Sequence, residues 1–274
     1  MSKKIIAGGC SFTFGHELSD DQQGKTPSNK TWSALLTDQK EYVCTAYPGS
    51  GNSGIARRVF NAVANNTEVE GVVVMWSFLS RYDWAMPRHK FLESTRWASI
   101  SPWDTNAGNE EAFRTIQGSE AQQKVWKTRR ENFLETGVQP FAESIYKYAA
   151  NQYHEIYLSW KSIIWLQNIL EKKKIPFMFT LADNSLFYNE YKLHSDQDNL
   201  MQALYNEIDF SNWFFFGERK MGFNQWALME DYDRGTTHPL DKAHHDAVQL
   251  MLPTFNKLIG DNNVYMDKEL DQQD

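Results

Sequence analysis

The chain has 274 residues, of which 41% are hydrophobic and 14% aromatic, including ten Trp, so it can bury a sizeable core. Its formal net charge of −7 disfavours a binder of nucleic acid or of an anionic membrane, which needs a basic patch. No apolar run reaches the ~18 residues of a membrane-spanning helix, and the apolar N-terminal stretch is too short for a signal peptide. We therefore expect a soluble, cytoplasmic protein with neither nucleic-acid nor membrane partners.

The first predicted strand ends in glycines and a hydroxyl. Residues 5–7 are apolar, Gly8 and Gly9 permit a sharp turn, and Ser11 follows. Such a turn would lift Ser11 off the strand end as a candidate nucleophile. The alternative is an ordinary turn in which Ser11 or Thr13 caps a helix.

A second strand, turn and helix follow. A polar, turn-rich segment at 20–30 precedes a short helix at 32–36, with Thr31 as its predicted N-cap. Residues 42–47 are rich in β-formers and predict a strand, and 55–65 predict a helix. The segment between them is glycine-rich, as expected for a turn at the end of a buried strand.

The glycines of this turn match the dinucleotide-binding fingerprint G-x-G-x-x-G between Gly49 and Gly54. Glu68 and Glu70 lie near the offset of a ribose-binding acid. However, the fingerprint normally closes the first βα unit, and these acids precede the next strand rather than end it. A dinucleotide enzyme is therefore only a minor alternative, and we expect no cofactor.

The third predicted strand, at 71–77, is a continuous apolar run of the kind found in a parallel sheet covered on both faces. Periodicity is then lost between residues 79 and 137, a charged segment in which Trp residues are scattered. An irregular insertion of this length beside a sheet predicts a lid or a binding region.

The second half alternates again. Residues 138–173 predict one long or once-broken helix, 175–181 a fourth strand, 186–208 partly helical structure and 213–216 a short fifth strand. Strands alternating with helices predict an α/β fold: a three-layer α/β/α sandwich with a mainly parallel, flavodoxin-like five-stranded sheet. We expect a single domain over 1–274, carrying the insertion at about 79–137.

The last predicted element is a helix with an apolar stripe, preceded by a loop at 235–240 that contains His238. Asp241 is its predicted N-cap. In open parallel sheets the crevice at the carboxyl ends of the strands collects the functional groups, and loop residues such as His238 are candidates for it.

Three short segments together resemble the SGNH, or GDSL-like, hydrolase superfamily. Gly9-Cys10-Ser11 is similar to its first block with Cys in place of Asp, Gly49 occupies the place of its second-block glycine, and His238-Pro239 matches its last block. The resemblance implies an ester hydrolase in which Ser11 is the nucleophile, His238 the base, and the amides of Ser11 and Gly49 the oxyanion hole. It extends to phage-encoded members, which implies a host cytoplasm.

Two residues of that family pattern are missing. The residues after the third strand include Arg81 but no Asn, so Asn52 or Arg81 is the candidate substitute in the oxyanion hole. The family's acid three residues before the histidine is replaced by Gly235. Asp231 or Asp233 is then the candidate group to orient the imidazole, unless a backbone carbonyl does so.

The leading hypothesis is a serine esterase or carbohydrate O-deacylase. Its substrate would be a small-molecule or carbohydrate ester, with Trp84 and Trp103 of the insertion as candidate contacts because indole rings can stack on sugars. The alternative is a catalytically impaired SGNH-like binding or structural module, such as a virion component.

Two other chemistries are weaker. A zinc site from His238, His244 and Asp241 matches no strong ligand spacing, and the two cysteines are too few for a disulfide scaffold, so we expect no metal. Cys10 as the nucleophile would also need a base. His244 and His245 are expected on the helix surface or in support of the site.

Overall fold

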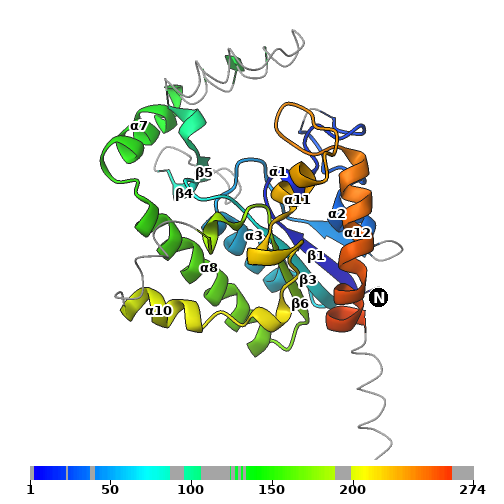
Figure 1. The fold of residues 1–274 in the computed structure, drawn as a ribbon. Coiled ribbons are helices and arrows are strands. Elements are labelled where there is room, and N and C mark those ends of the chain that lie inside the picture. The colour runs from blue at the N-terminus through cyan, green and yellow to red at the C-terminus, as the bar shows by residue number, and fades with distance from the viewer. Residues whose placement is uncertain are drawn as a thin grey trace, which may run out of the picture.

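The computed structural model describes residues 3–22, 24–37, 41–86, 96–105, 134–188 and 199–260, together with the single positions 124, 127, 128 and 131. Within these residues the chain is an α/β fold built on a parallel sheet (Figure 1). The strands of this sheet are β1 (Lys4–Gly8), β2 (Glu41–Cys44), β3 (Val69–Trp76) and β6 (Phe177–Leu181).

The sheet has the order β2-β1-β3-β6, and all three pairings are parallel. Ala7 near the end of β1 pairs with Cys44 on one side and Val73 on the other. This order places the first strand in the interior and its carboxyl end beside those of its neighbours, as in flavodoxin-like sheets. The loops after β1, β2 and β3 therefore meet at one edge.

The predicted fifth strand is not a strand among the described residues. Trp213 makes a single parallel bridge to Phe179 of β6, and the amide of Phe214 donates to the Phe179 carbonyl at 2.8 Å. The chain turns just before this point in a 3₁₀ helix, Phe210–Asn212, and the Trp213 ring packs edge-on against Phe179 at 5.4 Å. Aromatic packing, rather than a β ladder, thus fixes this segment at the sheet edge.

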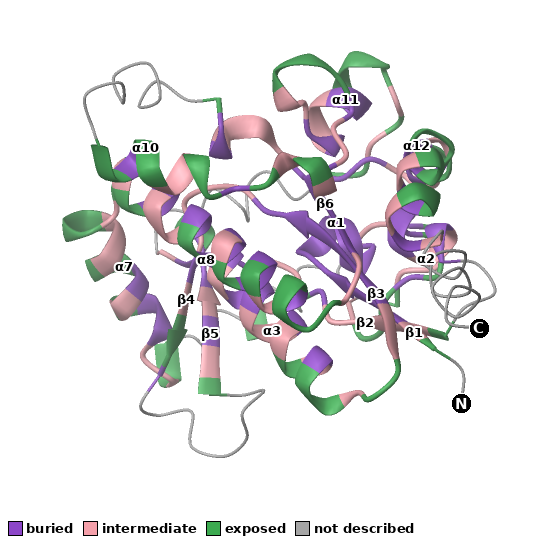
Figure 2. Cartoon of the chain, turned by 90° about the horizontal axis from the view of Figure 1, so that it is seen from below, coloured by how far each residue is buried: buried purple, intermediate pink, exposed green. Residues whose placement is uncertain are grey.

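Helices cover both faces of the sheet. One face packs on α3 (Asn52–Asn65) and α8 (Gln152–Lys172). The other packs on α2 (Trp32–Leu36), α11 (Phe223–Met229) and α12 (Asp241–Phe255). The strands β1, β3 and β6 are largely buried between these layers (Figure 2), which explains their continuous apolar runs, whereas the edge strand β2 is exposed or partly buried.

Helix ends follow the sequence signals in one case and depart from them in another. Thr31 is the N-cap of α2, and its hydroxyl accepts from the Ala34 amide at 3.2 Å, as predicted. The predicted cap of α12 was Asp241, but Leu240 is the N-cap and Asp241 is the first helical residue. The Asp241 carboxylate binds Ser19 and Lys30 instead, so a tertiary contact overrides the capping role.

The long helical pattern after residue 137 is broken once. Helix α7 (Val138–Tyr148) ends at Ala149, and α8 begins after Asn151, whose side chain accepts from the His154 amide at 2.9 Å. This confirms the once-broken alternative. Other described elements are α10 (Asn199–Asn206) and the 3₁₀ or π turns Asn184–Leu186, Glu218–Lys220 and Asn256–Gly260.

Part of the insertion forms an antiparallel hairpin of β4 (Tyr82–Ala85) and β5 (Trp97–Ile100), followed by the 3₁₀ turn Pro102–Asp104. The hairpin packs on α7 in an apolar cluster of its own. Most of the segment between residues 106 and 133, and residues 87–95, lie outside the described residues, so the predicted extent of the insertion is not tested. In the part of the chain that is described, no helix has the length and apolarity needed to cross a membrane.

Candidate active site

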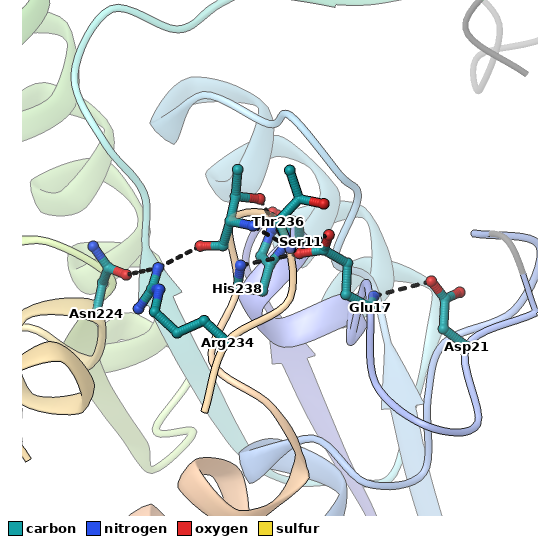
Figure 3. Close-up of polar contacts among 8 residues, drawn as sticks. Ser11, Glu17, Asp21, Asn224, Arg234, Thr236 and His238 are labelled. Carbon is teal, nitrogen blue, oxygen red and sulfur yellow. Dashed lines mark hydrogen bonds and ion pairs between the residues drawn. The ribbon is translucent and has the colours of Figure 1, made fainter. Parts of the chain in front are cut away.

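Ser11 lies directly after the first strand of the sheet. It is the first residue of α1 (Ser11–Phe14), a single turn of helix that Gly15 ends in the left-handed conformation, with φ of 90°. His238 lies in the loop before α12 and reaches the same point from the far end of the chain. The His238 Nε2 atom is 2.7 Å from the Ser11 hydroxyl (Figure 3).

The other ring nitrogen of His238 faces a carboxylate. His238 Nδ1 is 2.7 Å from Oε2 of Glu17, a residue that follows α1 by only a few positions. With Nδ1 protonated and donating to Glu17, Nε2 is free to accept the proton of the Ser11 hydroxyl. Ser11, His238 and Glu17 thus form a continuous chain of hydrogen bonds, all three drawn in Figure 3.

Backbone amides fix the Glu17 carboxylate. Oε1 accepts from the Thr236 amide at 2.8 Å, and Oε2 accepts from the amides of Thr237 and His238 at 3.0 Å each. Burial alone would raise the pKa of Glu17, but the hydrogen bond and charge of His238 and these amides hold it well below its usual range. Glu17 is therefore ionised at neutral pH.

Glu17 takes the place that the sequence predicted for Asp231 or Asp233. The Asp233 carbonyl accepts from the Leu240 amide at 3.0 Å, in the turn beneath the His238 loop. Gly235 explains the change: a Cβ atom at this position would lie 2.9 Å from Cδ of Glu17. The position that carries the acid in the resembled family is glycine here, and the carboxylate of Glu17 fills the volume next to it.

The loop that carries Glu17 is strained and anchored. Glu17 has a φ of 69°, an unusual conformation for a residue with a side chain, and its amide donates to Asp21 at 3.0 Å. The same loop is tied to the start of α12 by Asp241, which accepts from the Ser19 amide at 3.0 Å and from Lys30 Nζ at 2.8 Å. These bonds connect the Glu17 loop to the helix that follows His238.

Gly49 lies in a tight turn after β2. The Ser50 amide donates to the Tyr47 carbonyl at 3.1 Å, Pro48 is the second residue of the turn, and Gly49 has a φ of 79°. This is the pattern of a type II turn, whose third residue needs a positive φ and is therefore usually glycine. The Gly49 amide takes no part in the turn bond, and a Cβ atom at Gly49 would meet no other atom within 4 Å.

The two predicted substitutes for the missing oxyanion Asn are engaged elsewhere. Asn52 is buried; its side chain accepts from the Ser77 amide at 2.7 Å and donates to Ser159 Oγ at 3.0 Å. Arg81 donates to Ser77 Oγ at 2.8 Å and lies 4.9 Å above the Phe78 ring. The Asn52 contacts link α3 to the residue that follows β3, whereas Arg81 contacts Ser77 and Phe78 just after that strand. Their role as oxyanion donors stays a prediction.

In the segment that matches the dinucleotide fingerprint, the glycine amides that would bind a phosphate already bind a side chain of the protein. The amides of Gly51 and Gly54 donate to the carboxylate of Asp83 at 3.0 and 3.1 Å. A bound phosphate would have to displace this buried carboxylate. The structure therefore disfavours the dinucleotide alternative.

The remaining candidates have other partners. His244 is fully buried, its Nδ1 accepts from the Trp32 amide at 3.1 Å, and burial, aided by the charge of His238, lowers its pKa to about 3. His245 is exposed. Cys10 is fully buried and packs in an apolar core cluster. Among the described residues, no three His, Cys, Asp or Glu side chains are grouped so as to hold a metal ion.

Trp84 and Trp103 remain at the surface of the insertion. Their side chains are 50% and 44% exposed, although they are among the largest apolar groups of the chain. Trp84 packs with one side against Phe141 of α7, at a ring distance of 5.4 Å. Both indoles are therefore able to contact a ligand.

The residue that sequence reasoning missed is Glu17. It belongs to no motif, and its position depends on the left-handed residues Gly15 and Glu17 that return the chain towards the sheet edge. The available signal was indirect: Gly235 stands where an acid was expected, so an acid from another loop at the same edge of the sheet had to be considered.

No protein-family model matches this sequence, and the search of curated proteins found no match. Solved structures do match. A psychrotrophic esterase from a Pseudoalteromonas species is 11% identical with a TM-score of 0.45, covering 93% of this chain and 97% of its own. A phospholipase A1 from Streptomyces albidoflavus is 12% identical with a TM-score of 0.39, covering 94% and 100%.

A member of the lipolytic G-D-S-L family from Veillonella parvula is 11% identical with a TM-score of 0.38, covering 94% of this chain and 99% of its own. None of these proteins is described as a phage protein, so the expected link to phage-encoded members is not supported. The chain is thus similar, at low sequence identity, to solved structures described as an esterase, a phospholipase and a lipolytic G-D-S-L protein.

Proposed function

We propose that the protein is a serine ester hydrolase with Ser11 as nucleophile, His238 as general base and Glu17 as the carboxylate that orients the base. The observation that carries this proposal is the chain of two 2.7 Å hydrogen bonds, from Ser11 Oγ to Nε2 and from Nδ1 to Glu17. A serine hydroxyl is a weak nucleophile at neutral pH, and an adjacent imidazole of fixed tautomer is what activates it.

In the first half of the reaction, Ser11 Oγ attacks the ester carbonyl and His238 takes the hydroxyl proton. The amides of Ser11 and Gly49 donate to the oxyanion of the tetrahedral intermediate. When the ester C–O bond breaks, His238 returns the proton to the departing alcohol and an acyl-serine remains. Water, deprotonated by His238, then attacks the acyl-serine and releases the acid.

The alternative of a catalytically impaired module is not favoured. That alternative depended on two missing groups, the acid that orients the histidine and the oxyanion Asn. Glu17 supplies a carboxylate that contacts His238 Nδ1, as the missing acid would. The oxyanion Asn is not replaced in this proposal, and one absent oxyanion donor costs about 3 kcal/mol of transition-state stabilisation. We therefore expect a working enzyme that is slower than one with three donors.

The substrate belongs to the small-molecule or carbohydrate esters. The exposed indoles of Trp84 and Trp103 support the carbohydrate class, because a flat apolar ring at the protein surface can stack on a sugar face.

The nucleophile is tested by labelling with a fluorophosphonate probe. We expect the wild-type protein to be labelled and to hydrolyse p-nitrophenyl acetate, and the Ser11→Ala variant to show neither property. The Cys10→Ala variant is the matched control, because it alters the neighbouring residue and should retain labelling. Equal labelling of the wild type and the Ser11→Ala variant would refute the assignment of Ser11.

A further inference from the structure

The buried carboxylate of Asp83 connects the insertion to the glycine turn of the candidate site. Asp83 lies on β4, and its side chain is only 1% exposed. Its Oδ2 atom accepts from the amides of both Gly51 and Gly54, and its Oδ1 atom accepts from Ser99 Oγ at 2.5 Å. Arg58 of α3 lies 3.9 Å from Oδ1.

These contacts complete the N-terminus of α3. Its N-cap is Gly51, which has no side chain with which to accept an amide, and Gly54 is the third helical residue. An N-cap side chain normally serves this purpose, and a negative charge at a helix N-terminus is also stabilised by the helix dipole. Asp83, about 30 residues further along the chain, supplies both functions from another element.

Only glycine at positions 51 and 54 lets the Asp83 carboxylate come this close to the backbone. A Cβ atom at Gly51 would lie 2.7 Å from Asp83 Oδ2, and one at Gly54 would lie 2.1 Å from Oδ1. Gly51 and Gly54 therefore admit a carboxylate of the protein itself, whereas Gly49 serves the turn.

Two connections run from Asp83 to the turn that carries Gly49. One is the backbone, because Gly51 follows Gly49 by two residues and is held by the carboxylate. The other passes through Arg58, which interacts with Asp83 and also donates to Ser50 Oγ, while the Ser50 hydroxyl donates to the Tyr47 carbonyl at 2.7 Å. Asp83 therefore reaches the two residues that follow Gly49, Gly51 directly and Ser50 through Arg58, and the Ser50 hydroxyl in turn bonds to Tyr47 before Gly49.

From this geometry we propose that Asp83 is a positioning residue that holds the Gly49 turn in its oxyanion-binding shape. The proposal rests on the proposed function. It implies that the hairpin β4–β5 is part of the catalytic framework, in addition to any contact that the insertion makes with a substrate. A misplacement of about 1 Å at a reacting centre can reduce a rate by about 100-fold.

The test compares Asp83→Ala and Asp83→Asn with Asp104→Asn. In Asp83→Ala we expect kcat for p-nitrophenyl acetate to fall about 100-fold with little change in KM, because the oxyanion forms only during the reaction. Asp83→Asn should retain most of the activity, since an amide oxygen can still accept from both glycines. Asp104 is the control: it is a buried carboxylate of the same insertion, but it accepts from Ser101.

A double-mutant cycle with Gly49→Ala tests whether Asp83 acts through the turn. If it does, the losses in kcat from Asp83→Ala and Gly49→Ala should be less than additive. The reason is that a turn already displaced by Asp83→Ala has little oxyanion stabilisation left for Gly49→Ala to remove. Additive losses, or an equal loss in Asp104→Asn, would overturn the proposal.

Hydrogen exchange separates this proposal from the proposed function. In Asp83→Ala, the amides of residues 49–54 should exchange faster while those of β1 stay protected. This readout does not depend on catalysis. If Ser11 is never labelled but the exchange changes as expected, the proposed function fails while Asp83 still holds the turn; unchanged exchange at 49–54 contradicts the role of Asp83 itself.

Discussion

Glu17 is the residue on which the orientation of the imidazole depends, because its carboxylate contacts both His238 Nδ1 and the backbone around it. In Glu17→Gln, the side-chain amide can donate to Nδ1, which would favour the tautomer that cannot accept from Ser11. We expect kcat to fall by about 10³- to 10⁴-fold, by analogy with other serine triads, with little change in KM. Steady-state kinetics on p-nitrophenyl acetate measure this. Asp233→Asn is the control and should retain activity; equal losses in both variants would argue against Glu17.

The pH dependence of the wild-type enzyme follows from the same contacts. The pKa of Glu17 is held well below its usual range, so this group stays ionised in the range from pH 5 to 8. The pKa of His244 is lowered to about 3, so this imidazole stays neutral there. The acidic limb of kcat/KM should therefore have a slope of one, from a single protonation. A slope of two would mean that a second group titrates with the base.

Gly235 offers a direct test of why the acid lies elsewhere in this chain. A Cβ atom at this position would fall 3.0 Å from Glu17 Oε2, the atom that contacts His238. In the Glu17→Ala variant this volume is vacant, and an aspartate at position 235 can place its carboxylate there. We expect the double variant Glu17→Ala/Gly235→Asp to be at least 10-fold more active than Glu17→Ala alone.

The single variant Gly235→Asp should be less stable than the wild type, because two carboxylates then compete for one space. Thermal unfolding checks this. A double variant that folds but is no more active than Glu17→Ala would show that position 235 cannot take over the role.

At the scale of elements, His244 joins α12 to α2 through the Trp32 amide. Its folded-state pKa of about 3 lies below the ordinary value of 6.5, so the unfolded chain binds its proton first as the pH falls. Stability should therefore decrease as the pH falls from 6.5 towards 3. His244→Gln retains an acceptor for Trp32 but cannot be protonated, so its Tm should depend less on pH in this range. A parallel pH dependence in the two proteins would contradict this account.

The sequence predicted the four paired strands and the helices α2, α3, α8 and α12, because burial on both faces or on one stripe leaves a clear apolar pattern. It failed where tertiary contacts decide. Trp213 reads as a strand residue but is fixed by ring packing, and Asp241 reads as a cap but is drawn to Lys30. Glu17 could not be found by spacing, since only the folded chain shows which acid reaches His238.

At the scale of the whole molecule, the insertion brings exposed indoles to a protein whose sheet is otherwise enclosed by helices. If Trp84 and Trp103 bind a sugar, the double variant with alanine at both positions should lose about 10-fold in kcat/KM on an acetylated oligosaccharide. It should keep its rate on p-nitrophenyl acetate. Trp165→Ala is the control, because this half-exposed indole lies on α8 against Phe60. Equal losses on both substrates would exclude a role specific to sugars.

Ser11 and His238 are separated by 227 positions, and Glu17 and His238 by 221. Contacts between segments so distant in sequence form late, because the entropy of closing the intervening chain is lost before they are made. Ser11 and His238, the proposed nucleophile and base, therefore meet only when α12 docks beside the start of the chain. If the proposed function holds, partly folded forms with an intact sheet would lack an activated Ser11 and should show no esterase activity.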